Sequence, residues 1–209
     1  MQDLIDCVNV LKSSEASKII DSRINEFSEI KEMDRNVIFK ELCFCIMTAN
    51  CAAEKCIEIH EKIGKNFNNL SQADLTKMFK KLGYRFPNIR SKYIIEARNN
   101  KNVLIEKIKF DSNNDNSLRE WLVKNIKGLG YKEASHFLRN IGFKNYAIID
   151  FHIVDLLVKY NLIEKPKQIS KKKYIEIETI LKDIGTKLNL SLAELDLYLW
   201  FLETGKILK

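Results

Sequence analysis

A short turn between two helical patterns constrains the fold of this chain more than any other segment. It spans residues 127–132 (KGLGYK) and holds two of only seven glycines in a chain of 209 residues. Glycine lacks a Cβ, so it can adopt a positive φ and allow another backbone to approach closely. Beyond the turn, apolar residues recur at helical spacing: Ala134, Phe137, Leu138 and Ile141. The pattern predicts a helix-hairpin-helix over 118–141.

The remainder of the chain is also helical in its periodicity, and no strand alternation of useful length occurs. Residues that can cap helices stand before several apolar repeats: Asp34, Ser71, Asp150 and Ser191. Pro87 is predicted to begin a helix and to hold Phe86 in an extended conformation. The helix after Asp34 is apolar on almost every face in its second half, so we expect it to lie at the centre of a helical lobe. The predicted fold class is all-α.

The start of the second hairpin helix is a candidate anion site. The first amides of a helix have no intrahelical acceptor and carry partial positive charge, so they bind anions such as a DNA phosphate. Gly128 and Gly130 would bring these amides close to the DNA, and Lys127 adds a positive charge beside them. We therefore expect Lys127, Gly128 and Gly130 to contact DNA phosphates.

Lys132 and Asp150 are the candidate catalytic residues. Lys132 falls in the first turn of the second hairpin helix, where the helix dipole disfavours a charged ammonium. A neutral lysine amine is a nucleophile that can form a Schiff base. Asp150 is predicted to be the N-cap of the next helix, which would fix its carboxylate. Lysines at helix starts usually lie on the surface and aspartates there are usually caps, so it is their combination with a phosphate site that suggests chemistry at a deoxyribose.

These residues carry a resemblance to a known superfamily. Segment 128–142 (GLGYKEASHFLRNIG), followed by 148–152 (IIDFH), resembles the helix-hairpin-helix DNA glycosylases in their bifunctional, lysine-bearing form. Further segments are similar to the archaeal-type (type 2) 8-oxoguanine DNA glycosylase/AP lyase family: 41–46 (ELCFCI), 48–50 (TAN), 83–86 (GYRF) and 197–200 (LYLW), with a chain that ends soon afterwards at a lysine. The resemblance covers nearly the whole chain. The hairpin with its lysine and aspartate is specific to the superfamily, and the other segments support the narrower family.

The resemblance implies two helical lobes with an active site in the cleft between them. One lobe would span 34–149 and carry the hairpin, and the other would combine 1–33 with 150–209. The implied substrate is double-stranded DNA that contains 8-oxoguanine, and the damaged base must leave the stack before it can react. Lys132 would attack C1′ and the resulting Schiff base would permit β-elimination, while Asp150 would help to deprotonate Lys132 and stabilise charge on the sugar. No cofactor or metal is implied.

The resemblance also implies candidates for the base pocket and for a wedge that enters DNA. Phe86 could intercalate or stack on the extruded base, although a place in the core is the alternative. Trp200 could present a second aromatic surface, with burial in the core as the alternative. N7 of 8-oxoguanine is a donor, so discrimination from guanine needs an acceptor, and the terminal carboxylate of Lys209 is the candidate. A frayed C-terminus is the ordinary alternative.

Composition limits the other classes of partner. The formal net charge of +7 suits a polyanion, and neither a signal peptide nor an apolar run of membrane length is present. The five cysteines are odd in number and lack an iron–sulfur spacing, so we expect buried free thiols in a reducing cytoplasm. We expect a cytoplasmic, chromosome-associated protein that acts as a monomer.

Two other functions also fit these residues. A related lysine glycosylase that acts on oxidised pyrimidines would share the hairpin, Lys132 and Asp150, and would differ only in the base pocket. A helix-hairpin-helix can also be a DNA-binding module without catalysis, in which Lys132 would contact a phosphate. Trapping with borohydride separates the module from both enzymes.

Overall fold

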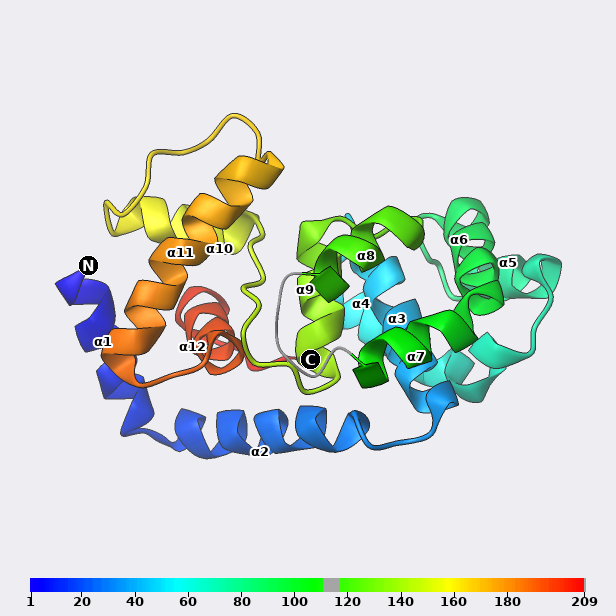
Figure 1. Cartoon of the computed structure of the whole chain (residues 1–209), viewed down its shortest axis with the longest axis horizontal. Helices are drawn as coiled ribbons and strands as arrows, with labels where there is room; N and C mark the ends of the chain where they lie inside the picture. The colour runs from blue at the N-terminus through cyan, green and yellow to red at the C-terminus, as the bar shows by residue number, and fades with distance from the viewer. Residues whose placement is uncertain (111–116, 209) are drawn as a thin grey trace. The chain divides into compact units, whose positions relative to one another are not determined.

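Helices make up all of the regular structure in the part of the chain that the computed structural model describes, residues 1–110 and 117–208 (Figure 1). This confirms the predicted all-α class. The elements are α1 (Gln2–Lys12), α2 (Glu15–Ile30), α3 (Arg35–Thr48), α4 (Ala53–Ile63), the 3-10 helix η1 (Gly64–Asn68), α5 (Gln72–Lys81), α6 (Pro87–Asn99), α7 (Lys101–Phe110), α8 (Ser117–Asn125), α9 (Tyr131–Asn140), α10 (Phe151–Lys159), α11 (Lys171–Leu188) and α12 (Leu192–Thr204).

The predicted caps begin the helices that they precede. The Asp34 carboxylate accepts a hydrogen bond from the amide of Asn36 at 2.7 Å, at the start of α3. Ser191 and Glu194 form a complete capping box at the start of α12, in which each side chain bonds the other residue's amide. At the start of α5 the Ser71 hydroxyl accepts a hydrogen bond from the Asp74 amide at 3.1 Å, without the reciprocal bond to the Ser71 amide. These bonds satisfy amides that have no intrahelical acceptor, so they fix where each helix starts.

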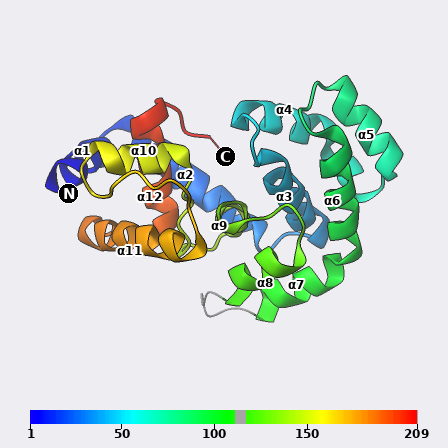
Figure 2. The ribbon, with the colours of Figure 1, turned by 90° about the horizontal axis from the view of Figure 1, so that it is seen from above.

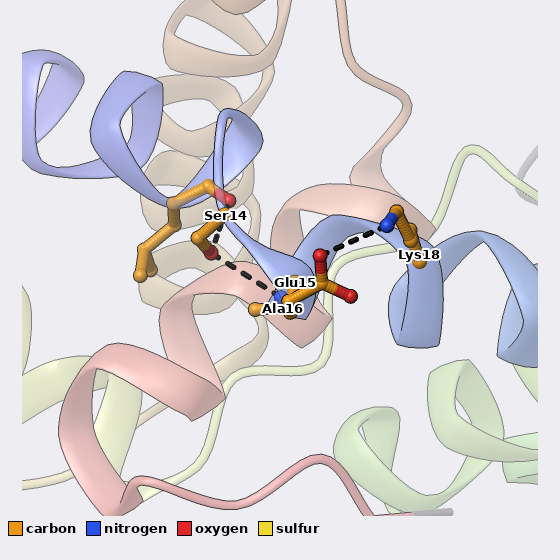
Figure 3. Close-up of polar contacts among 5 residues, drawn as sticks. Ser14, Glu15, Ala16 and Lys18 are labelled. Atoms are coloured by element: carbon orange, nitrogen blue, oxygen red, sulfur yellow. Dashed lines mark hydrogen bonds and ion pairs between the residues drawn. The ribbon is translucent and has the colours of Figure 1, made fainter.

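The junction between α1 and α2 shows how one serine can end one helix and begin the next. The Ser14 hydroxyl donates to the Leu11 carbonyl at 2.8 Å and accepts from the Ala16 amide at 3.2 Å (Figure 3). An exposed ion pair between Glu15 and Lys18, at 2.8 Å, adds to the first turn of α2. Such a pair contributes little to stability, so the serine defines the junction.

Two compact units make up the chain. The hairpin unit comprises residues 30–137, and the terminal unit comprises residues 1–29 and 138–209. These bounds differ from the predicted 34–149, because residues 138–149 bond within the terminal unit. The Ala193 amide donates to the Lys144 carbonyl at 3.1 Å, and the Ala147 amide donates to the Glu178 carboxylate at 2.9 Å.

The hairpin unit is built around α3. Every residue of 41–48 is buried, as predicted for a helix that is apolar almost all round. This helix packs against α4, η1, α6 and α7 (Figure 2). Sequence periodicity did not predict η1, which continues the chain directly from α4 at Gly64, where φ is +54°.

The terminal unit is built around α12, which packs against α1, α10 and α11 (Figure 1). Within the described residues, none of the helices combines the length and the apolarity that crossing a membrane requires. The same residues contain no group of three or more His, Cys, Asp or Glu side chains placed to hold a metal ion.

The five cysteines are all free thiols, as predicted. Cys43, Cys45 and Cys56 are buried, whereas Cys7 and Cys51 are only half-buried. The expectation of burial therefore holds for three of the five.

Candidate active site

A helix-hairpin-helix lies at the predicted place, with α8 and α9 joined by residues 126–130 (Figure 1). Arg119 of α8 is fully buried and holds the two helices together. Its guanidinium donates to the Ser135 hydroxyl at 3.2 Å and lies 5.2 Å from the centre of the Tyr131 ring. The Tyr131 hydroxyl also bonds the Glu120 carboxylate of α8. These contacts set the angle at which α9 presents its first turn.

The two glycines of the hairpin have different structural roles. Gly128 has a φ of +88°, and a Cβ at this residue would lie 2.6 Å from a ring carbon of Tyr93. Only glycine therefore fits at position 128. Gly130 does not adopt a positive φ, so the expectation of positive φ holds for one glycine of the pair. A Cβ at Gly130 would meet only the flexible Glu133 carboxylate, at 3.1 Å.

The amide of Gly130 already bonds an anionic group. It donates to the Glu133 carboxylate at 3.0 Å, in the geometry of a side chain that reaches back to the start of its own helix. An external anion at this amide would have to displace Glu133. Lys127, next to the turn, is exposed and forms an ion pair with Glu96 at 3.1 Å, which leaves its side chain 65% exposed.

Lys132 lies in the first turn of α9, as predicted, and is half-buried. Its positive charge acts on Cys56 of α4. Burial and a hydrogen bond with Cys51 raise the pKa of the Cys56 thiol, and the positive charges of Lys132 and Arg90 oppose that rise. Lys132 and Arg90 therefore both bring positive charge to the surroundings of this buried thiol.

Asp150 is the N-cap of α10, also as predicted. Its carboxylate accepts from the Ile153 amide at 3.0 Å, and the residue is half-buried. The chain that leads to it is held by Tyr174 of α11, whose hydroxyl donates to the Ala147 carbonyl at 2.7 Å and accepts from the Ile149 amide at 3.2 Å. Asp150 belongs to the terminal unit and Lys132 to the hairpin unit.

Phe86 is half-buried, and two arginines flank its ring. The guanidinium of Arg85 lies 5.0 Å from the ring centre, and that of Arg90 lies 5.8 Å from it. Its backbone has φ −125° and ψ 54°, so the predicted extended conformation is wrong. The neighbouring Tyr84 is the core residue of this segment, with its hydroxyl bonded to the Met47 carbonyl at 2.8 Å.

Trp200 is half-buried near the end of α12. Its ring meets the ring of His152 edge to face at 4.8 Å, and His152 lies 4.0 Å from the ring of Phe151. The Trp200 Nε1 is buried and has no hydrogen-bond partner among the described residues. Phe151, which is 67% exposed, was not a predicted site residue, because exposure of an aromatic at a helix start leaves no signal in the sequence. Lys209 lies outside the described residues.

Known proteins match this chain over nearly its whole length, a span that includes the hairpin, Lys132 and Asp150. A family model described as 8-oxoguanine DNA glycosylase matches residues 20–190. Proteins named 8-oxoguanine DNA glycosylase/AP lyase are 49% identical in Korarchaeum cryptofilum, over 100% of this chain and 99% of that protein, and 51% identical in Methanocaldococcus jannaschii, over 99% of each.

Solved structures agree with these relatives. The M. jannaschii 8-oxoguanine glycosylase/lyase, in complex with a 15mer DNA containing 8-oxoguanine, superposes with a TM-score of 0.93 at 51% identity, over 99% of each chain. The 8-oxoguanine DNA glycosylase of Thermotoga maritima gives a TM-score of 0.91 at 37% identity, over 100% of this chain and 99% of that one. This chain therefore belongs to the 8-oxoguanine DNA glycosylase family.

Proposed function

We propose that this protein extrudes 8-oxoguanine from double-stranded DNA, excises it, and cleaves the remaining abasic site by β-elimination. The observation that carries the proposal is the likeness, over the full chain, to a structure of a glycosylase/lyase bound to DNA that contains 8-oxoguanine. The excess of positive charge, +7, suits the same partner. The protein would act as a monomer on the chromosome in the cytoplasm.

Lys132 and Asp150 supply the chemistry in this proposal. The Lys132 amine attacks C1′ of the extruded nucleotide, the bond to the base breaks, and the sugar ring opens to a Schiff base. Loss of a proton from C2′ then breaks the bond between C3′ and its phosphate. The Asp150 carboxylate accepts a proton from Lys132 and stabilises the positive charge that develops on the sugar.

A base-release assay tests the proposed substrate. Duplexes that carry 8-oxoguanine or an oxidised pyrimidine should be compared under single-turnover conditions, so that product release does not hide the chemical step. We expect release of 8-oxoguanine and little release of the pyrimidine. Faster release of the pyrimidine would favour the related lysine glycosylase. Release of neither base would favour a DNA-binding module without catalysis.

The hairpin turn provides a prediction about DNA binding. We propose that a DNA phosphate takes the place of the Glu133 carboxylate at the Gly130 amide, with Lys127 as a nearby cation and Gly128 shaping the turn. Gly130→Val should then weaken binding to lesion-containing and undamaged duplexes alike, because the new side chain stands where the phosphate approaches. Binding titrations at several salt concentrations measure this effect.

A matched glycine variant shows whether the effect comes from the fold. Gly128→Ala should lower the thermal unfolding temperature, because its Cβ would lie 2.6 Å from Tyr93 at a φ of +88°. Gly130→Val should unfold at nearly the temperature of the wild type. A loss of affinity for lesion-containing DNA alone would contradict the phosphate role.

The base pocket is proposed to include Phe86, Trp200 and the terminal carboxylate of Lys209. Extension of the chain by a few residues past Lys209 moves the carboxylate away, and it should sharply reduce excision of 8-oxoguanine, whose N7–H would lose its acceptor. Cleavage of a ready-made abasic site should change little, because that step does not involve the base. Excision by the extended protein at the wild-type rate would contradict this role of the carboxylate.

A further inference from the structure

The segment around Phe86 is tied to the end of α3 by donors from three side chains. The acceptors are backbone carbonyls at and just beyond the last turn of that helix, where the helix dipole favours positive charge. The bonds are Tyr84 Oη to the Met47 carbonyl at 2.8 Å, Arg90 Nη2 to the Ala49 carbonyl at 3.2 Å, and Arg85 Nη1 to the Asn50 carbonyl at 3.4 Å. Two anchored guanidinium groups thus lie within about 6 Å of the centre of the Phe86 ring.

Arg90 differs from Arg85 because it also reaches the hairpin. Its guanidinium lies 5.8 Å from the centre of the Phe86 ring and 5.7 Å from that of Tyr93. Its Nη1 would lie 3.1 Å from a Cβ placed on Gly128, and the same Cβ would touch the Tyr93 ring. One half-buried side chain therefore contacts the end of α3, the Phe86 ring and the hairpin turn, all within the hairpin unit.

The contacts of Arg90 depend on the shape of the guanidinium as well as on its charge. A planar group can donate at its edge to a carbonyl while its face lies against aromatic rings, and a lysine ammonium cannot do both. Arg90 Nε is buried without a hydrogen-bond partner among the described residues, which costs stability. Arg98 Nε on the same helix is also buried without such a partner, so the contacts with the Phe86 ring and the hairpin turn are what distinguish Arg90.

We propose that Arg90 is a positioning residue that holds Phe86 in a fixed relation to the hairpin turn. Entry of Phe86 into the DNA stack would then occur while the turn holds the phosphate backbone, which couples base extrusion to backbone binding. The inference rests on the proposed function, because it requires that Phe86 enters DNA.

Arg90→Lys tests this role because it keeps the charge and removes the planar group. Single-turnover excision should be measured on 8-oxoguanine paired with cytosine and on 8-oxoguanine opposite an abasic analogue, where less pairing must be broken. We expect a loss of about tenfold or more on the paired substrate, because extrusion there must break both pairing and stacking, and a much smaller loss on the unpaired one. An equal loss on both substrates would overturn the proposal.

Arg98→Lys is the matched control on the same helix. Arg98 donates to the Leu70 carbonyl at 2.8 Å and to the Phe67 carbonyl, and these bonds lie at η1 and the turn after it. Its replacement should lower thermal stability without changing the ratio of the two excision rates. A changed ratio in Arg98→Lys would show that the ratio reports general destabilisation, and the proposal would fail.

A double variant separates positioning from an independent role. In a Phe86→Ala background, Arg90→Lys should cause little further loss on the paired substrate, because the residue that it positions is absent. If the double variant loses excision activity by the product of the two single-variant factors, the two residues act independently and the proposal is overturned. If Arg90→Lys does not fold, Tyr93→Leu removes the ring that lies near both the Arg90 guanidinium and Gly128, and it should show the same dependence on pairing. A wild-type protein that excises neither substrate would instead overturn the proposed function.

Discussion

Lys132→Gln is expected to abolish the covalent adduct that borohydride forms between this protein and DNA containing 8-oxoguanine. Borohydride reduces a Schiff base to a stable amine, so an adduct requires a lysine or another amine at C1′. Glutamine is similar in size and cannot form the Schiff base. Lys132 lies half-buried in the first turn of α9, and glutamine can take its place there, so the hairpin should stay intact.

Lys127→Gln is the matched control for this experiment. Lys127 is on the same hairpin, but its side chain is 65% exposed and pairs with Glu96. This variant should keep the adduct and bind DNA somewhat more weakly, with a smaller dependence on salt. Lys132→Gln should still bind lesion-containing DNA. An adduct that persists in Lys132→Gln would show that another amine is the nucleophile.

Asp150→Asn is expected to slow single-turnover release of 8-oxoguanine by about a hundredfold or more, because it removes a charge that stabilises the transition state. Asparagine caps helices about as well as aspartate, so the hydrogen bond from the Ile153 amide should survive. The free energy of unfolding should therefore fall by no more than about 1 kcal/mol. Release rates and thermal melting, measured on the same preparations, distinguish chemistry from stability.

A second capping aspartate provides the control for Asp150. Asp34 begins α3 and accepts from the Asn36 amide at 2.7 Å, and the same bond lowers the pKa of its carboxyl. Asp34→Asn removes a capping charge in the hairpin unit, and base release should stay near the wild-type rate. If Asp150→Asn slows release no more than Asp34→Asn does, Asp150 is a cap without a catalytic role.

Features that depend on a few neighbouring residues were predictable from the sequence. Asp34 and Ser191 cap helices through bonds to amides two and three residues away, so their roles follow from local spacing alone. The all-α class and the place of the hairpin follow from apolar repeats of helical period in the same way. The first-turn position of Lys132 and the N-cap position of Asp150 are also local properties, although their catalytic roles remain predictions.

Features that depend on distant partners were decided only by the tertiary structure. Gly128 is required because Tyr93 of another helix lies against it, whereas the equally prominent Gly130 faces only Glu133. Phe86 does not adopt the conformation expected before Pro87, and the tertiary structure places two guanidinium groups against its ring. Periodicity reports which face of a helix is buried, but it does not report which distant side chain covers that face, because partner choice depends on packing between elements.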